Sequence, residues 1–232
     1  MAKGKKWKRI FKLLLWLLLI FLGLSILSVV LYKFVHPPVT PLMVLRGFET
    51  DKKTDYQWIP IEKMSPNLFQ AALAAEDDTF LKHHGFDFRA IKLAYESNQK
   101  SKKTKGGSTI SQQTAKNVFL WPHRDFVRKG LEAWFTILIE FVWGKERIME
   151  MYMNVVEFGP GVYGVEAASL KYFKKHAAKL SKYEAASLIS VLPNPHIYHV
   201  LTPSKRTQRY RSAILKRMNY IPKVKFEGSS ND

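Results

Sequence analysis

Residues 65–87 read SPNLFQAALAAEDDTFLKHHGFD, an apolar segment that ends in three consecutive acids. Ser65 and Pro66 are typical of a helix cap and first helical position, because serine accepts from a free backbone N–H and proline has none to satisfy. The apolar residues that follow recur at helical spacing, so Glu76 falls near the carboxyl end of a helix, where the helix dipole disfavours negative charge. Glu76 is therefore a candidate functional residue, although such acids can also be solvated or paired with Lys82 and the histidines.

Apolar residues recur at helical spacing on the carboxyl-terminal side of this stretch as well. Asp87 can cap a second helix that runs into the polar residues 97–105, for which we predict a mobile loop. Residues 125–142 predict a long, mostly buried helix, and Ser181 with Glu184 forms a capping box. Further helices are expected at residues 110–119, 146–154, 163–174, 181–192 and 204–218. Alternating β-branched runs are nearly absent, so the predicted fold class is mostly α.

The composition indicates a folded protein with an anionic partner. Of its 232 residues, 47% are hydrophobic and 13% aromatic, enough to bury a core and to exclude a chain that is disordered throughout. The formal net charge is +18, which favours anionic lipid, pyrophosphate or nucleic acid as a partner. We find no zinc finger, RRM signature or basic region leading into heptads, so no nucleic acid partner is expected. The chain has no cysteine, which excludes disulfides and thiolate ligands.

The amino terminus predicts a membrane anchor. Residues 13–31 read LLLWLLLIFLGLSILSVVL, about the ~20 apolar residues that a helix needs to cross a bilayer. The basic residues before this run should stay in the cytoplasm, which places the rest of the chain outside it. A cleaved signal peptide is the competing interpretation, but its apolar region would be shorter and no small-residue cleavage pattern is present. The predicted division is a cytoplasmic tail (1–12), a membrane span (13–32), a linker that begins the extracytoplasmic part (33–59), a folded domain (60–220) and a tail (221–232).

Residues 106–117 read GGSTISQQTAKN and predict a binding site for an anion. A glycine turn that opens a helix presents free backbone N–H groups, and the hydroxyl, amide and lysine side chains add further donors. The segment is not a P-loop, because no lysine follows a glycine at the required spacing. A capped surface helix would explain the hydroxyls but not the dense Gln, Lys and Asn residues. The candidate substrate-binding residues here are Ser108, Thr109, Gln113 and Lys116.

A second charged group follows this segment in the chain. Arg128 and Glu132 are four positions apart and Lys129 and Glu132 are three apart, so these side chains can share one helix face. A simple helix salt-bridge cluster would be a sufficient explanation. However, these charges lie on a helix otherwise built from large apolar residues, and charge kept beside a core usually has a partner or a task. Arg124, just before this helix, is a further candidate.

Taken together, these motifs resemble those of the family that polymerises the glycan strands of peptidoglycan. The resemblance covers residues 60–211. The chain most resembles the monofunctional biosynthetic peptidoglycan transglycosylases, which are similar to the glycosyltransferase domain of class A penicillin-binding proteins. It implies a lysozyme-like, mostly α fold, anchored in the bacterial inner membrane by a single helix, with the catalytic domain in the periplasm. The motifs, in order, are EDDTFLKHHGFD, GGSTISQQTAKN, RKGLE, RIMEMYMNVVEFGPGVYGVEAASLKYF and KYEAASLISVLPNP.

The resemblance also implies roles for single residues. Glu76 would be the base that removes a proton from the sugar 4-hydroxyl of the acceptor, lipid II, and Glu132 would be the second catalytic glutamate. The lipid-linked nascent strand would be the donor, and undecaprenyl pyrophosphate would leave with inversion at the anomeric carbon. The groups placed near that pyrophosphate are Gln113, Lys116, Arg128 and Lys129, with Arg124 as a less certain companion.

No cofactor is expected to be required. Some members of the family use a divalent ion, and Mg²⁺ or Mn²⁺ is treated as optional because the sequence has no obvious metal cage. The predicted partners are lipid II, the lipid-linked strand and membrane lipids, with proteins of cell-wall synthesis or division as further candidates. We also consider that Asp78 raises the pKa of Glu76 by like-charge repulsion.

Two other functions fit the sequence in part. A lysozyme-like hydrolase would share the fold and an isolated glutamate, but it needs no pyrophosphate site. A noncatalytic membrane scaffold of the cell-envelope machinery would need no base at position 76. Loss of polymer formation on replacement of Glu76 would distinguish the enzyme from the scaffold.

Overall fold

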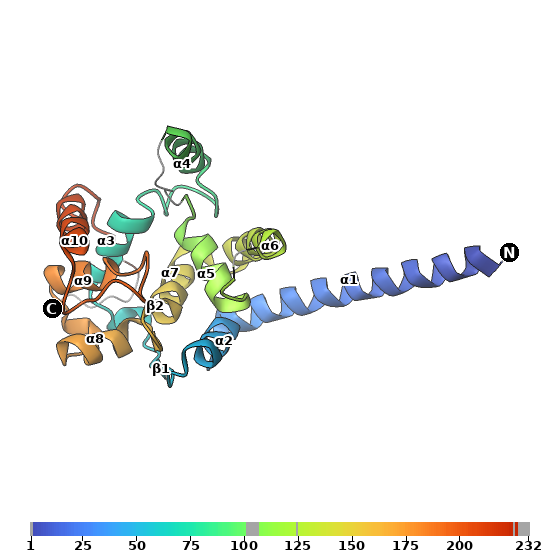
Figure 1. The fold of residues 1–232 in the computed structure, drawn as a ribbon, viewed down its shortest axis with the longest axis horizontal. Helices are drawn as coiled ribbons and strands as arrows, with labels where there is room; N and C mark the ends of the chain where they lie inside the picture. Colours follow the sequence, from blue (N-terminus) through green and yellow to red (C-terminus); the bar gives the residue numbers. More distant parts are fainter. Residues whose placement is uncertain (1, 101–106, 124, 225, 227–232) are drawn as a thin grey trace.

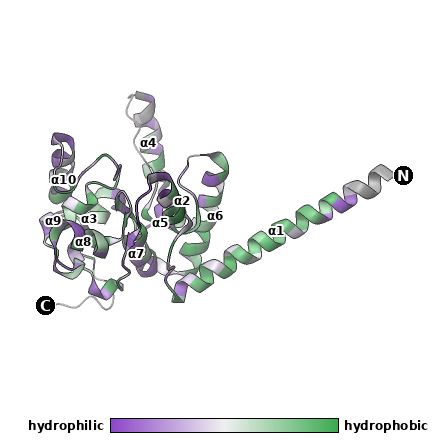
Figure 2. Ribbon diagram, turned by 60° about the horizontal axis from the view of Figure 1, so that its bottom comes forward, coloured by the Kyte–Doolittle hydropathy of each residue, from purple (hydrophilic) through white to green (hydrophobic). Residues whose placement is uncertain are grey.

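The computed structural model describes residues 2–100, 107–123, 125–224 and 226. A single long helix, α1 (Ala2–Phe34), projects from a body formed by the remaining elements (Figure 1). Within α1, residues 7–34 are long and apolar enough to cross a membrane, and Figure 2 shows hydrophobic residues along most of the helix. The body is predominantly helical, so the predicted fold class is confirmed.

The helices form where the caps and the apolar spacing predict them. Ser65 caps α3 (Pro66–Glu76) by accepting from the N–H of Asn67, and Asp87 accepts from the N–H of Ala90 in α4 (Phe88–Lys100). Thr109 opens α5 (Ile110–Phe119) with a capping box. The remaining predicted helices are α6 (Phe126–Val142), α7 (Gly144–Val155), α8 (Val165–Phe173), α9 (Lys182–Ile189) and α10 (Lys205–Arg217).

Several small elements were not expected from the sequence. Helix α2 (Pro41–Thr50) lies within the predicted linker, where Thr40 caps it and Pro41 occupies its first turn. Strands β1 (Asp55–Tyr56), β2 (Glu157–Gly159) and β3 (Val162–Tyr163) form one sheet in the order β1-β3-β2, and single 3-10 turns occur at Ile61–Lys63 and Ala177–Lys179. Strand β1 runs parallel to β3, whereas β2 is antiparallel to it. Strands of two or three residues are too short to show an alternating pattern.

Two predictions about the helices are wrong. Residues 97–100 belong to α4 and do not start a loop, so the helix continues into polar sequence beyond its last apolar residue. Residues 101–105 of the predicted loop lie outside the described part of the chain. Helix α6 is not mostly buried. Phe126 is 97% exposed and Phe141 is 89% exposed, so one apolar side of α6 faces away from the body.

Neighbouring helices hold α3, which carries Glu76, and α5, which carries Gln113. Helix α3 packs against α9 and α10, and α5 packs between α6 and α7. The buried amide of Asn154 on α7 accepts from the N–H of Ile59 and donates to its carbonyl, both at 2.9 Å, which joins α7 to the chain that leads into α3. The ends of α3 and α5 are therefore held in a fixed relation inside the body.

Helix α1 is docked on the body through its carboxyl-terminal third. The indole of Trp134 on α6 donates to Ser25 Oγ at 3.1 Å, and the indole of Trp143 donates to the carbonyl of Val29 at 2.7 Å. The guanidinium of Arg147 on α7 donates to two of the last carbonyls of the helix segment at 2.8 and 3.0 Å, which completes its carboxyl end. The residues of α1 that contact the body, Ser25 and Val29, therefore lie inside the predicted membrane span.

Gly164 tests the tightness of the turn that leads into α8. Its φ is +80°, and a Cβ at this position would lie 2.6 Å from the carbonyl oxygen of Asn154. We expect Gly164→Ala to lower the free energy of unfolding by about 2 kcal/mol or more, because strain at positive φ adds to a backbone clash. Thermal unfolding in detergent measures this. Gly130→Ala on α6, where a Cβ meets nothing within 4 Å, is the control and should be neutral or slightly stabilising. Equal changes in unfolding temperature for the two variants would show that the close approach of Gly164 to Asn154 is not what limits position 164.

Candidate active site

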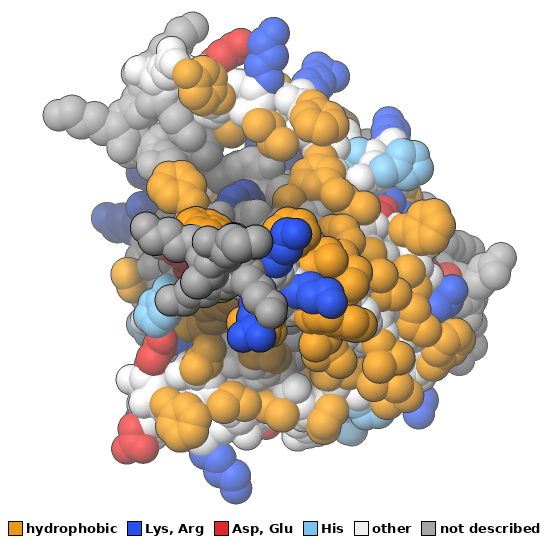
Figure 3. Space-filling view, turned by 90° about the vertical axis from the view of Figure 1, so that its right-hand side faces the viewer, with side chains coloured by type: hydrophobic (Ala, Val, Ile, Leu, Met, Phe, Trp, Pro, Cys, Tyr) orange, Lys and Arg blue, Asp and Glu red, His pale blue; other side chains and the backbone are white. Residues whose placement is uncertain are grey.

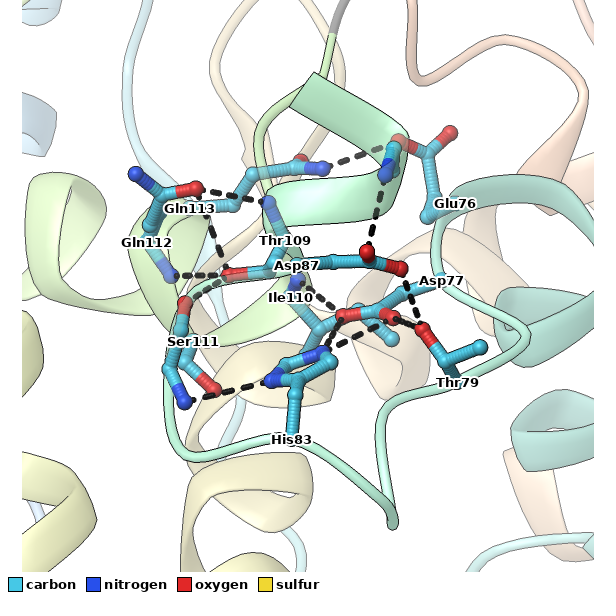
Figure 4. A network of polar contacts seen from close by, with 12 residues as sticks. Glu76, Asp77, Thr79, His83, Asp87, Thr109, Ile110, Ser111, Gln112 and Gln113 are labelled. Atoms are coloured by element: carbon cyan, nitrogen blue, oxygen red, sulfur yellow. Dashed lines mark hydrogen bonds and ion pairs between the residues drawn. The ribbon is translucent and has the colours of Figure 1, made fainter. Parts of the chain in front are cut away.

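Glu76 is the last residue of α3 and borders a cavity. The side-chain amide of Gln113 on α5 donates to Glu76 Oε2 at 2.9 Å (Figure 4). Gln113 is fixed by its place on a helix whose first turn is closed by the Thr109 capping box. This hydrogen bond orients the Glu76 carboxylate across the gap between α3 and α5.

Burial is the main cause that raises the pKa of Glu76 above its ordinary value. The hydrogen bond from Gln113 and the charge of Lys116 lower the pKa, whereas the neighbouring charge of Asp77 raises it further. The hypothesis that Asp78 causes the shift is not supported, because Asp78 is exposed and is not among the groups that act on Glu76. A carboxylate with a raised pKa is a stronger base than an ordinary glutamate.

Asp77 fastens the segment that carries Glu76 to the start of α5. Its buried carboxylate accepts from the N–H of Ile110 at 3.0 Å and lies 3.0 Å from Nε2 of His83. Nδ1 of His83 in turn accepts from the N–H of Gly85. The pKa of Asp77 is raised by burial, against which the bond from Ile110 and the charge of His83 act. Asp77 and His83 belong to the quoted motif, but the sequence alone did not mark them as a buried pair.

Glu132 on α6 forms ion pairs with two cations, Arg128 and Lys129. Arg128 donates to Glu132 Oε2 at 2.9 Å, and the ammonium of Lys129 pairs with Oε1. Glu132 and Arg128 are buried, whereas about half of the Lys129 side chain is exposed. The predicted cluster is therefore present, and it leaves the cation of Lys129 facing the cavity that it lines.

Three cavities meet around these groups. The acid-side cavity, about 420 Å³, is lined by four acids, by Arg217 at the end of α10 and by Tyr220 and Ile221 after it; the acids are Glu76, Asp77, Asp78 and Asp87. The cation-side cavity, about 280 Å³, is lined by Ser108, Gln113, Lys116, Pro122, Arg128, Lys129 and Glu132. The distal cavity, about 270 Å³, shares Gln113, Lys116 and Pro122 with the cation-side cavity. The acid-side and cation-side cavities share Ser108, and the hydrogen bond between Glu76 and Gln113 also links their walls, so we treat the three as one cleft.

The other predicted residues take distinct places. Ser108 lies at the boundary between the acid-side and cation-side cavities, 3.5 Å from the Lys129 ammonium. Thr109 is buried and donates to the carbonyl of Gly85 at 2.6 Å, so its hydroxyl holds the α5 cap. Arg124 lies outside the described residues. The structure thus brings together Glu76, Gln113, Lys116, Arg128, Lys129, Glu132 and Ser108 around one cleft.

A metal cage is not evident among the residues that the structure describes. No group of three or more His, Cys, Asp or Glu side chains there could hold an ion. His83 is committed to Asp77, and the neighbouring His84 is exposed, so the adjacent histidines do not converge. A divalent ion bound together with a pyrophosphate stays an untested prediction.

Sequence reasoning missed several residues that line the cleft. Arg46 on α2, Glu157 on β2 and His196 all border the distal cavity, yet Arg46 comes from the segment predicted to be a linker. The polar residues within RIMEMYMNVVEFG and LPNP were a usable signal, since Glu157 interrupts an apolar run. Their convergence depends on the sheet and on the turn after α9.

The cleft has the chemical parts of a transferase for a substrate with an anionic leaving group. A partly buried carboxylate with a raised pKa can take a proton from a hydroxyl, and fixed cations near it can stabilise charge that develops on a departing phosphate. The separation of acidic and cationic sides gives the acceptor and the leaving group different places.

Comparison with known proteins agrees with this arrangement. Residues 43–219 match the family model described as Transglycosylase. The chain is 54% identical over 193 residues to a biosynthetic peptidoglycan transglycosylase of Caulobacter vibrioides, covering 83% of this chain and 84% of that protein. A protein of the same description from Bdellovibrio bacteriovorus is 50% identical over 94% of this chain and 90% of its own length. One from Bacteroides thetaiotaomicron is 46% identical, with 89% and 86% covered.

The raised pKa of Glu76 predicts a pH-dependent stability penalty. For an acid whose pKa is raised by folding, the folded state holds its proton more tightly, so stability is lost as pH rises from the unfolded pKa, about 4.3, to the folded one. We expect Glu76→Gln to unfold at a higher temperature than the parent at pH 8, and this gap should close as the pH falls towards 4. Thermal unfolding at intervals between about pH 4 and 8 tests this prediction. Glu62→Gln, an exposed carboxylate, is the control; a gap independent of pH would show that burial of the charge is not the cause.

Proposed function

Because this chain belongs to the transglycosylase family and is a peptidoglycan glycosyltransferase, we propose that it polymerises lipid II into glycan strands with inversion and release of undecaprenyl pyrophosphate. The observation that carries the proposal is the position of Glu76, which is partly buried, lines the acid-side cavity and accepts a hydrogen bond from Gln113 of the cation-side cavity. The acceptor lies on the acid side and the donor pyrophosphate on the cationic side.

In the proposed reaction, Glu76 removes the proton from the 4-hydroxyl of the acceptor sugar. The oxygen attacks the anomeric carbon of the donor strand, and the bond from that carbon to the pyrophosphate oxygen breaks with its electron pair. The α linkage becomes β in one displacement, so no second carboxylate has to act as a nucleophile. The raised pKa of Glu76 supports its role as base at neutral pH.

The cationic side supports departure of the pyrophosphate. Lys116, Arg128 and Lys129 line one cavity, and fixed positive charge stabilises a leaving group without an added acid. Glu132 holds Arg128 and Lys129 in place from a buried position. We assign Glu132 to the positioning of these cations, since its carboxylate is engaged by both.

The lipid substrate also explains the apolar surface next to α1. Viewed along α1 from its amino-terminal side, the molecule shows hydrophobic side chains over much of the face around the helix (Figure 3). The exposed Phe126 and Phe141 of α6 belong to the element that binds α1 through Trp134. We propose that this face meets the outer leaflet, so that both lipid-linked substrates reach the cleft without leaving the membrane. Phe119 and Leu120 instead pack inside the body, where Phe119 stacks on Phe135.

Replacement of Glu76 tests the enzyme proposal. We expect Glu76→Gln to abolish polymer formation from lipid II, a loss of at least about 10²–10⁴-fold for removal of a general base. Product length on gels measures this, with moenomycin inhibition of the parent and Glu62→Gln as controls. A parent that cleaves finished peptidoglycan but ignores lipid II would favour a hydrolase. Full activity of Glu76→Gln would remove Glu76 from the mechanism.

The orientation of the chain can be tested by cysteine labelling, because the protein has no cysteine of its own. We propose that the amino terminus is cytoplasmic and the body periplasmic, since the charges that flank the span are positive on the amino-terminal side. A membrane-impermeant maleimide should label Glu62→Cys in intact spheroplasts, and Ala2→Cys only after lysis. Labelling in the reverse order would contradict this orientation.

A further inference from the structure

Much of the positive charge of the body is concentrated at the end that lies away from α1. Residues 158–224, called here the basic lobe, contain twelve Lys and Arg residues but only two acids, Glu166 and Glu184. The helices of this lobe are α8, α9 and α10, and Figure 1 shows them at the far end of the body from α1. The proposed reaction needs no cations at this end of the molecule, so their concentration there calls for another explanation.

Both acids of the basic lobe are already engaged within the protein. Glu166 is buried, accepts from the N–H of Ala177 at 2.8 Å and pairs with the imidazole of His176. Glu184 caps α9 and pairs with Lys175 at 2.7 Å. Within the described part of the chain, Lys175 is the one Lys or Arg of the lobe that has a salt bridge. Most of the positive charge of the lobe therefore lacks a counterion among the described residues.

Helix α10 presents three of these cations on one exposed face. Lys205, Arg209 and Lys216 are all exposed, and their spacings of four and seven positions place them along the same side of the helix. Figure 2 shows mostly hydrophilic residues along α10. Like charges four positions apart repel each other, and Lys205 in the first turn opposes the helix dipole. The arrangement does not serve the stability of α10, so an anionic partner outside the protein explains it better.

Aromatic rings accompany the cations of the basic lobe. The guanidinium of Arg211 lies 4.4 Å from the ring centre of Tyr183 on α9, and that of Arg206 lies 5.7 Å from the ring centre of Tyr198. Tyr183 is 52% exposed. An exposed ring offers an apolar face to the C–H groups of a sugar, and a guanidinium beside it can bind a carboxylate through two hydrogen bonds. This combination suits a polymer that carries both sugars and carboxylates.

The position of the basic lobe selects among the anionic partners. Anionic lipid headgroups lie at the surface of the membrane that α1 is proposed to span, and charge interactions are screened beyond about 8–10 Å. The lobe lies at the other end of the body (Figure 1). An acidic protein would supply charge but not the sugar rings that Tyr183 suits. Peptidoglycan, the polymer that this enzyme makes, has both sugars and peptides with free carboxylates.

We propose that the basic lobe binds the peptide carboxylates of finished peptidoglycan, with the face of α10 that carries Lys205, Arg209 and Lys216 as the main contact. The inference goes beyond the proposed reaction, because it concerns a polymer that is already made and is held outside the catalytic cleft. It relies on the proposed periplasmic position of the body, which the maleimide labelling tests separately. This contact would keep the enzyme beside the wall that receives the new strand.

Sedimentation with isolated peptidoglycan tests this surface. The full chain in detergent is mixed with increasing amounts of peptidoglycan, and the amount that carries half of the protein into the pellet is measured. We expect the triple variant Lys205→Gln, Arg209→Gln, Lys216→Gln to need about tenfold more peptidoglycan than the parent, as for the loss of three weak ion pairs. Chemical amidation of the peptidoglycan carboxylates should weaken binding of the parent more than binding of the variant, because both changes remove the same contacts.

A matched variant distinguishes this surface from total charge. Lys52→Gln, Lys53→Gln, Lys63→Gln removes the same charge from exposed positions outside the basic lobe and should change half-maximal binding by less than about twofold. Exchange of Lys for Arg and of Arg for Lys at the three positions of α10 keeps the charge and should keep the binding. Thermal unfolding and polymer formation from lipid II, both expected to match the parent, show that the α10 variants are folded.

Three results would overturn the proposal. They are parental binding by the folded α10 triple Gln variant, an equal loss in both triple Gln variants, and binding of the parent that amidation leaves unchanged. The second result would mean that net charge, and not the face of α10, attracts the polymer. Failure of the parent to polymerise lipid II would refute the proposed function instead, and the sedimentation experiment does not depend on that reaction.

Discussion

The buried carboxylate of Asp77 is the constraint on which the catalytic geometry depends. It receives the N–H of Ile110 at the start of α5 and contacts His83 in the loop that follows α3. An unpaired carboxylate would be expensive at this depth, so the loop, the end of α3 and the start of α5 have to stay together. Glu76 precedes Asp77, and Gln113 follows Ile110 by one helical turn. The hydrogen bond between Glu76 and Gln113 is thus a consequence of this junction.

The distribution of charge on either side of that junction gives the cleft its direction. One cavity is lined by carboxylates that include Glu76, and another is lined by cations that include Lys116 of α5. Glu132 pairs with two of those cations, Arg128 and Lys129. A base that is desolvated keeps a raised pKa, while cations placed across the cleft stabilise a leaving anion. Both effects act on Glu76, because the charge of Lys116 lowers its pKa and desolvation raises it. Desolvation is the larger effect, so the pKa of Glu76 stays above its ordinary value.

The membrane anchor is also part of the architecture. Trp134 and Trp143 bind α1 at Ser25 and Val29, inside the stretch that is apolar enough to span a bilayer. The body is therefore attached to α1 itself, before the proline-rich segment that follows the helix. In the proposed reaction both substrates are lipid-linked, and this attachment would hold the cleft at a constant height above the membrane that α1 is proposed to span.

The sequence by itself determined the long apolar helix, most of the other helices and the charge cluster of Arg128, Lys129 and Glu132, because caps, apolar spacing and i, i+4 charge pairs are local properties. It did not reveal α2, for which the cap Thr40 and Pro41 were available but were read as part of a linker. It placed Glu76 at a helix end and left open whether Asp77 or Asp78 raises its pKa, which burial and Asp77 raise in the structure. Only the tertiary structure showed that Asp77 joins the end of α3 to Ile110 at the start of α5, and that Arg46 and Glu157 line the same cavity. Burial and contact between distant segments depend on how the helices pack, and no local pattern in the chain records that packing.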